Sequence, residues 1–210
     1  MTPTIAEVAL VLFVGMGPIK VLVYYLTAIH DATPSVGRRV AFRAVATATI
    51  TALGLLVVGA TLMQLLHFSG EALIVAGGIV LLAYGIQMVL RPELHGPTEP
   101  PPSGATLLRA AIYPMGVPLI LNPAGVAATT IFSAEAADFG YLGIIALIVL
   151  AMGLLDLVVL VVARPIGPHL PREATLVLEQ LLGVLLAAIA VELIVIGLGG
   201  FGIIDVPPRL

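Results

Sequence analysis

Six long apolar stretches constrain this chain more than any other feature of its sequence. Each is close to the roughly 20 residues that an α-helix needs to cross the hydrocarbon core of a bilayer. We expect the spans over residues 8–29, 40–66, 72–90, 110–134, 139–163 and 174–198. Because 60% of the 210 residues are hydrophobic and 10% are charged, a soluble domain and a disordered chain are both excluded. The sequence predicts an all-α integral membrane protein with six transmembrane helices.

The remaining composition excludes several functional classes. The chain has no cysteine, so thiol redox chemistry, thiolate metal sites and disulfides are ruled out. A net charge of -3 with nine Lys and Arg residues offers no basic surface for nucleic acid. The four histidines have no ligand spacing, so neither a metal nor a cofactor is predicted. Without a nucleophile–base pair or a phosphate loop, an intramembrane enzyme is the weakest functional alternative.

Basic residues fall in alternate connections between the predicted spans. The connections after the second and fourth spans carry only acidic charge, at Glu71, Glu135 and Asp138. Arginines instead occupy or flank the connections after the first, third and fifth spans: Arg38, Arg39, Arg43, Arg91, Arg109, Arg164 and Arg172. The positive-inside rule therefore predicts that these three connections are cytoplasmic and that both termini are extracytoplasmic.

A repeat relates positions 105 residues apart. The matching pairs are Gly17-Pro18 with Asn122-Pro123, Gly78 with Gly183, and Gln87 with Glu192. Chance similarity between apolar helices is the alternative. If residues 1–100, which include the connection after the third span, and 101–210 are repeats of three spans each, the second half is inverted relative to the first. The reason is that an odd number of spans reverses the direction in which the next repeat enters the membrane. Many secondary transporters have this arrangement, with their site near the midplane where the repeats meet.

Prolines interrupt the first and fourth predicted spans at corresponding positions, Pro18 and Pro123. Proline removes a backbone donor and clashes with the preceding turn, so each helix should kink or break there. The freed backbone groups are tolerated only when buried in protein or lining a wet cavity. We therefore predict a solute site built from Gly17, Pro18, Asn122, Pro123 and Gly125. The alternative is that both breaks are simple structural kinks. The hydroxyl groups of Thr129, Thr130 and Ser133 either line the cavity or bond back to the backbone of their own helix.

Three charged residues, Lys20, Asp156 and Glu192, lie inside predicted spans. A charge at the bilayer centre costs about 2.5–3.5 kcal/mol on insertion scales, which makes each a functional candidate. Lys20 and Asp156 differ by roughly 5 Å in depth at about 1.5 Å per residue, so we predict that they pair. Lys20 would bind a substrate carboxylate or exchange a proton with Asp156. Glu192, whose repeat mate Gln87 is also polar, is a separate protonatable group. A structural ion pair is the alternative.

Four stretches of this sequence, in order along the chain, resemble the MarC family. This family is also called the neutral amino acid transporter family and belongs to the LysE-related superfamily. The resemblance covers nearly the whole chain. It rests on Pro18-Ile19 through Arg38-Arg39, Gly77-Gly78 through Gln87, Tyr113-Pro114 through Gly125, and Leu182-Gly183 through Glu192. It implies a six-span protein of the prokaryotic inner membrane, in a family of which some members transport small neutral amino acids.

The chain departs from the family pattern at four positions. The family usually has Asn or Asp before the first proline and Gly before the second, but here Gly17 and Asn122 are exchanged. Lys20 replaces a small residue, and Glu192 replaces glutamine. The function expected is secondary transport of a small polar solute, most simply a neutral amino acid, by alternating access with proton coupling. The expected partners are that solute, the bilayer and a second copy of the chain. The rival reading is a non-transporting assembly partner whose kinks and charges are structural.

Overall fold

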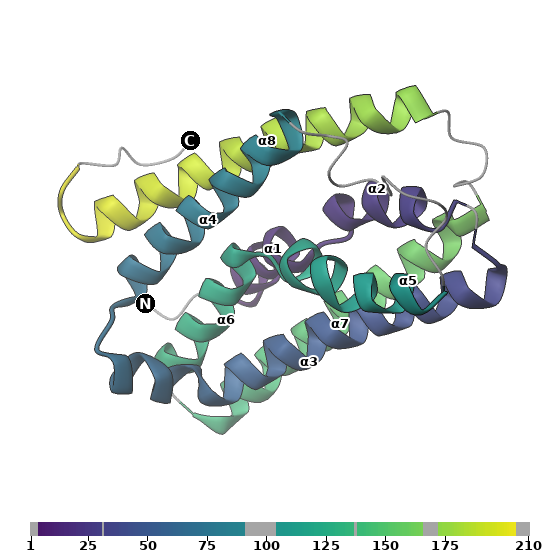
Figure 1. Cartoon of the computed structure of the whole chain (residues 1–210). Helices are drawn as coiled ribbons and strands as arrows, with labels where there is room; N and C mark the ends of the chain where they lie inside the picture. The colour runs from purple at the N-terminus through teal and green to yellow at the C-terminus, as the bar shows by residue number, and fades with distance from the viewer. Residues whose placement is uncertain (1–3, 31, 91–103, 137, 166–171, 205–210) are drawn as a thin grey trace.

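The computed structural model describes residues 4–30, 32–90, 104–136, 138–165 and 172–204 (Figure 1). The described chain is helical apart from turns and short connections. Its elements are α1 (Ile5–Met16), α2 (Ile19–Ala28), α3 (Pro34–Leu66), α4 (Gly70–Leu90), α5 (Gly104–Ala110), η2 (Ala111–Ile120), α6 (Pro123–Glu135), α7 (Phe139–Ala163) and α8 (Arg172–Gly200). The predicted all-helical class is therefore confirmed.

Five stretches of the described helices are long and apolar enough to cross a membrane, and a bent pair brings the number to six. The five are Ile5–Leu26, Pro34–Leu66, Gly70–Leu90, Phe139–Ala163 and Gly183–Gly200. The bent pair joins Gly104–Ile120 to Pro123–Glu135 at an angle of 68°. This angle confirms the predicted break of the fourth span.

The first span is interrupted where the sequence predicts it. α1 ends at Met16, Gly17 is extended with φ -68° and ψ 156°, and α2 begins at Ile19. At its other end α1 begins with a capping box, because the Thr4 N–H donates to Glu7 Oε2 at 2.7 Å and the Glu7 N–H donates to Thr4 Oγ1 at 3.3 Å. The interruption leaves two short helices within one apolar stretch.

Two helices begin six residues before the predicted spans. α3 begins at Pro34, six residues before the predicted start, because Thr33 is extended and proline is tolerated in the first helical turn. The fourth span begins at Gly104 instead of residue 110. Both extensions lie at the polar, arginine-bearing end, where hydropathy no longer marks the helix.

Glycines set the contact between α4 and α8, which lie side by side apart from α3 and α7 (Figure 1). A Cβ added to Gly85 would lie 2.8 Å from the Gly183 carbonyl oxygen, and one added to Gly183 would lie 2.9 Å from the Gly85 carbonyl oxygen. Only glycine allows backbones so close, which is how many helices associate in membranes.

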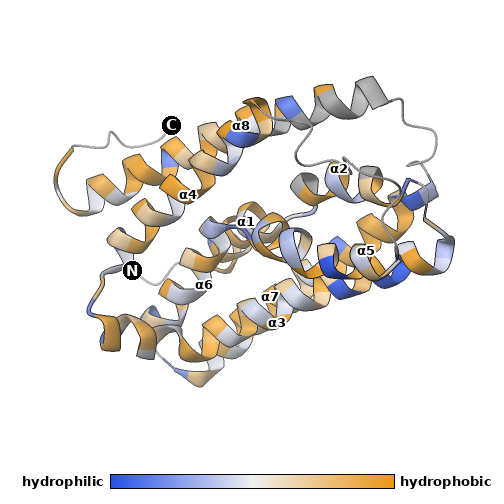
Figure 2. Cartoon of the chain, viewed as in Figure 1, coloured by the Kyte–Doolittle hydropathy of each residue, from blue (hydrophilic) through white to orange (hydrophobic). Residues whose placement is uncertain are grey.

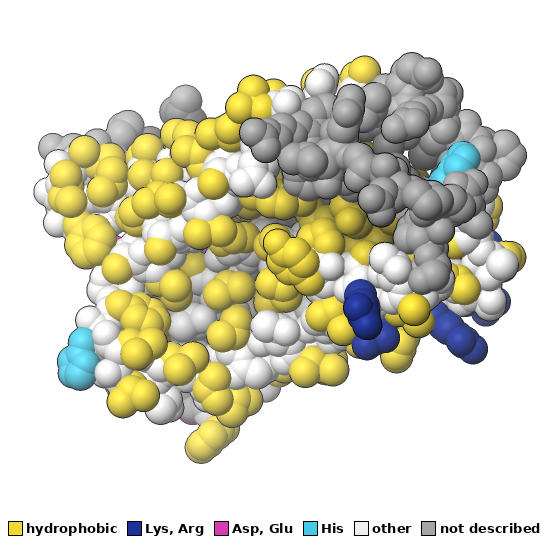
Figure 3. All heavy atoms as spheres, viewed as in Figure 1, with side chains coloured by type: hydrophobic (Ala, Val, Ile, Leu, Met, Phe, Trp, Pro, Cys, Tyr) yellow, Lys and Arg dark blue, Asp and Glu magenta, His cyan; other side chains and the backbone are white. Residues whose placement is uncertain are grey.

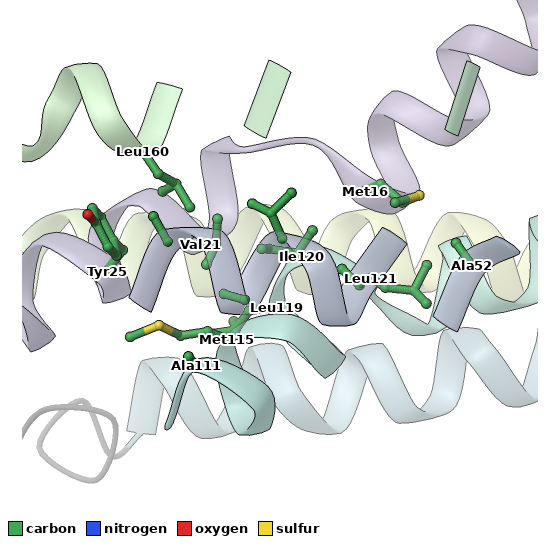
Figure 4. Close-up of a cluster of buried hydrophobic side chains, with 14 of the residues drawn as sticks. Met16, Val21, Tyr25, Ala52, Ala111, Met115, Leu119, Ile120, Leu121 and Leu160 are labelled. Atoms are coloured by element: carbon green, nitrogen blue, oxygen red, sulfur yellow. The ribbon is translucent and has the colours of Figure 1, made fainter. Parts of the chain in front are cut away.

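The main core lies where the two broken spans meet α3 and α7. Figure 4 shows Met16 of α1, Tyr25 of α2, Met115 of η2 and Leu160 of α7 in this cluster, all fully buried. Ala44, Ala48 and Ala52 of α3 are also fully buried, as expected for a small-residue stripe that allows close packing. Many large apolar side chains are exposed, as they are in proteins that face lipid. Figure 2 shows that hydrophobic residues predominate along most of the helices.

Candidate solute site at the two helix breaks

The two interrupted spans meet at their breaks. The Asn122 N–H donates to the Gly15 carbonyl oxygen at 3.0 Å, and Asn122 Nδ2 donates to the Val14 carbonyl oxygen at 3.1 Å. The last carbonyls of a helix have no partner within that helix. Asn122 therefore satisfies two carbonyls at the end of α1 from the far side of the second break.

Asn122 also caps the helix that follows it. Its Oδ1 accepts a hydrogen bond from the Gly125 N–H at 2.9 Å, and Pro123 occupies the first turn of α6. The Asn122 side chain is 1% exposed. The same amide group thus holds the end of α1 and the start of α6 together in a buried position.

A glycine pair allows this close approach. A Cβ on Gly15 would lie 2.5 Å from Gly125 Cα, and a Cβ on Gly125 would lie 2.7 Å from the Gly15 carbonyl oxygen. Of the two, only Gly125 was predicted as a site residue. Gly15 was missed, although its place two residues before Gly17-Pro18 was the signal that could have found it.

The segment that leads into the second break is itself irregular. η2 contains Pro114 and Pro118, each after a cis peptide bond, and Tyr113 and Val117 have non-helical dihedral angles. Gly116 packs on α3, where a Cβ would lie 2.9 Å from Thr47 Cβ. The path from α5 to Asn122 is therefore held against α3 rather than by a regular helical ladder.

The hydroxyl groups that follow the second break are engaged within the protein. Thr129 Oγ1 donates to the Gly125 carbonyl oxygen at 2.8 Å, and Thr130 Oγ1 donates to the Val126 carbonyl oxygen at 2.7 Å. Ser133 Oγ accepts from the Ala60 N–H at 3.0 Å. The bonds of Thr129 and Thr130 match the predicted role of bonding back to their own helix. The Ser133 bond goes to α3 and matches neither of the two predicted roles.

The predicted intramembrane charge pair is only partly described. Asp156 of α7 is fully buried, on the same face as Gly153, which lies against the Thr49 hydroxyl of α3. Lys20 belongs to α2, but its side chain lies outside the described residues. The Lys20–Asp156 pair therefore stays a prediction.

Two contacts bring the helices that carry this pair to one part of α3. Tyr25 Oη donates to the Gly37 carbonyl oxygen at 3.0 Å, and a Cβ on Gly37 would lie 2.9 Å from Arg164 Nε. Lys20 precedes Tyr25 by five residues in α2, and Asp156 precedes Arg164 by eight residues.

Gln87 and Glu192 lie on exposed faces of α4 and α8. Gln87 is ten residues beyond Gly77, whose added Cβ would lie 3.1 Å from the Pro123 carbonyl oxygen. That places Gln87 roughly 15 Å along α4 from the second break. The contacts described here do not bring either side chain to the junction of the two breaks.

These features define a multi-pass integral membrane protein with an interrupted span on each side of a buried junction. A model of the MarC family integral membrane proteins matches residues 2–201. The chain belongs to the MarC family, as the resemblance predicted.

Archaeal relatives support the same assignment. A UPF0056 membrane protein of Pyrococcus horikoshii is 26% identical over 199 residues, which cover 92% of this chain and 96% of the relative. One of Pyrococcus abyssi is 25% identical over 198 residues, with the same coverage of 92% and 96%. One of Methanocaldococcus jannaschii is 30% identical over 152 residues, which cover 68% of this chain and 70% of the relative. No solved structure matches the chain.

Proposed function

We propose that this chain is a secondary transporter of a small zwitterionic solute, with a neutral amino acid as the first candidate. The observation that carries the proposal is the junction of the two breaks, where Asn122 bonds the carbonyls of Val14 and Gly15. Solute would bind at this junction and alternately reach each side of the membrane. Gly17, Pro18, Lys20 and Pro123 would complete the site.

Helix ends explain why a zwitterion suits this junction. α1 ends there with carbonyl groups, the partially negative end of a helix dipole, and α6 begins there with N–H groups, the partially positive end. When the junction opens, an ammonium group could bond the carbonyls of Val14 and Gly15, while a carboxylate bonds the first N–H groups of α6. Asn122 would close the two ends onto each other in the absence of solute.

Paired contacts support two inverted repeats. A Cβ on Gly78 would lie 2.9 Å from the Ala190 carbonyl oxygen, and one on Gly183 would lie 2.9 Å from the Gly85 carbonyl oxygen. Residues 78 and 183 are 105 apart, and so are 85 and 190. The shift therefore converts one contact into the other, as expected of a two-fold relation between the halves 1–100 and 101–210.

Burial and helix contacts follow the same shift. Along α4, Gly78, Leu81 and Gly85 are buried, and so are their mates in α8, Gly183, Leu186 and Ala190. The exposed residues Ala83, Ile86 and Gln87 match the exposed Ala188, Val191 and Glu192. α4 contacts α6 as α8 contacts α2, and α1 contacts α7 as η2 contacts α3. Chance similarity between two apolar helices would not be expected to preserve contacts between different helices.

Charge placement supports the proposed orientation. Arg38 and Arg39 lie at the start of α3, and Arg164 follows α7 at the same end. Glu71 and Asp138 lie at the starts of α4 and α7, at the opposite end. We propose that the arginine end is cytoplasmic, with both termini outside, in the plasma membrane of a prokaryote.

We propose that the buried carboxylate of Asp156, paired with Lys20, couples solute transport to the movement of protons. A fully buried carboxylate in a membrane span needs a partner or a proton. Exchange of a proton within this pair would link solute movement to the proton gradient. Glu192, whose polar repeat mate is Gln87, is proposed as a second protonatable group. A second copy of the chain is proposed as a partner.

Counterflow tests the transport function. Proteoliposomes loaded with unlabelled alanine are given labelled glycine or alanine outside, and protein-free liposomes are the control. Label should accumulate transiently only where the protein is present. If folded protein gives no accumulation with either label, the proposed substrate class is wrong.

A non-transporting membrane protein is the second candidate. It is favoured by the burial of Asn122 and by the hydroxyls of Thr129 and Thr130, which bond to their own helix. Under this function Lys20→Met and Glu192→Gln would alter stability or assembly and no solute would accumulate. Counterflow by the unsubstituted protein therefore separates the two functions.

A further inference from the structure

Exposed arginines gather at one end of the bundle. Arg43 of α3 and Arg109 of α5 are both exposed, and Figure 3 shows Lys and Arg side chains on this face only near that end. Neither side chain forms a hydrogen bond or an ion pair within the described chain. Of the acidic residues whose side chains the structure describes, Glu7, Glu71, Glu135 and Asp138 lie at the other end of the bundle.

Packing of α5 and η2 along α3 brings these two arginines to one region. A Cβ on Gly104, at the start of α5, would lie 3.9 Å from Val36, and one on Gly116 of η2 would lie 2.9 Å from Thr47 Cβ. Arg109 lies between the two glycines, so it is level with the part of α3 between Val36 and Thr47. Arg43 is in that part, next to Ala44, whose carbonyl oxygen would be 3.1 Å from a Cβ on Gly116.

Aromatic side chains accompany both arginines at the surface. Tyr113 is one helical turn beyond Arg109 towards the second break and is 74% exposed, and Phe42, next to Arg43, is 65% exposed. Arginine with exposed aromatic side chains nearby is the arrangement expected at the level of lipid headgroups.

We propose that Arg43 and Arg109 bind the phosphate of an anionic phospholipid, whose acyl chain lies along Tyr113 and the contact between α3 and η2. The guanidinium group suits phosphate because its N–H groups can form paired, charge-assisted hydrogen bonds. A lipid held by one arginine from each element fastens α5 to α3. Because α5 and η2 lead directly to Asn122, the lipid steadies the segment that positions the second break.

Native mass spectrometry of the purified protein tests this site. The protein in detergent is mixed with equal amounts of phosphatidylglycerol and phosphatidylcholine, and the retained lipid is measured. The unsubstituted protein should retain phosphatidylglycerol about tenfold over phosphatidylcholine. R43Q/R109Q should lose that preference, while R43K/R109K should keep part of it because the charge remains.

A matched variant separates a local site from general attraction. R38Q/R209Q also removes two arginine charges. Arg38 is five residues before Arg43, about 140° round α3, and Arg209 lies outside the described residues. It should keep the preference of the unsubstituted protein. Equal loss in both double variants, from proteins with the same unfolding temperature in detergent, would overturn the site, as would an absence of preference in the unsubstituted protein.

Discussion

The backbone N–H of Asn122 bonds the carbonyl oxygen of Gly15 at 3.0 Å, which joins the breaks of two membrane spans. The Asn122 side chain adds a bond to Val14 and another to Gly125. One residue thus satisfies groups freed by both interruptions. Because such groups cannot be left unpaired in a bilayer, this junction ties the two interrupted spans together, and it is the place where the proposed transporter would open.

Replacement of Asn122 tests the strength of the junction. Asn122→Ala removes the α6 cap, which costs about 1 kcal/mol, and leaves the Val14 carbonyl without its amide partner, which costs about 1–3 kcal/mol. Thermal unfolding in detergent should show a clear loss of stability. Gln87→Ala, at an exposed position, serves as the control and should change stability little. Equal stability of the two variants would show that the bonds of Asn122 contribute nothing measurable.

The glycine pair gives a prediction with a matched control. Gly125→Ala should destabilise the protein by about 1–3 kcal/mol, since the new methyl would meet the Gly15 carbonyl oxygen at 2.7 Å. Gly54→Ala should be neutral or stabilising by about 0.5–1 kcal/mol, because nothing lies within 4 Å of its Cβ. Unfolding by heat or denaturant would measure the stability of each variant relative to the unsubstituted protein. A tolerated alanine at 125 would mean that α1 and α6 do not pack as closely as described.

The proposed inverted repeat predicts matched effects at repeat mates. Gly78→Ala and Gly183→Ala should each weaken the contact between α4 and α8, because a Cβ at either position would lie 2.9 Å from the opposing carbonyl oxygen. Their unfolding temperatures should fall by similar amounts. A large fall for one and none for the other would argue against a two-fold relation between the halves.

Single and double substitutions test whether the buried carboxylate of Asp156 pairs with Lys20. Asp156→Asn or Lys20→Met alone should destabilise the protein by about 3–5 kcal/mol, because each would leave one member of the proposed pair without its partner. The double variant should regain most of that stability. If the pair couples transport to protons, the double variant folds but its counterflow loses its dependence on pH. Full recovery of pH-dependent flux would restrict the pair to a structural role.

Orientation can be measured directly because the natural chain has no cysteine. Ser35→Cys lies at the arginine end of α3, and Ser69→Cys lies just before α4 at the other end. A membrane-impermeant thiol reagent added to intact cells should label position 69, and position 35 only after the cells are opened. The opposite pattern would reverse the proposed topology.

Much of the fold could be predicted because the bilayer limits what an apolar chain can do. Span length follows from membrane thickness, and the breaks follow from the missing N–H of Pro18 and Pro123. The start of α3 at Pro34 was not predictable from hydropathy, since polar residues there continue the helix. The bonds from Asn122 to α1 were also hidden, because they join residues more than a hundred positions apart and depend on tertiary packing.

The most direct test of the central claim is competition during counterflow of labelled alanine. Unlabelled alanine, propionate and ethylamine would be compared at equal concentration, because they carry both charges, the carboxylate alone and the ammonium alone. If the end of α1 and the start of α6 bind a zwitterion, alanine should compete at least about tenfold better than either singly charged compound. Equal competition by all three, or an absence of alanine counterflow from folded protein, would contradict a zwitterion site at the junction of the two breaks.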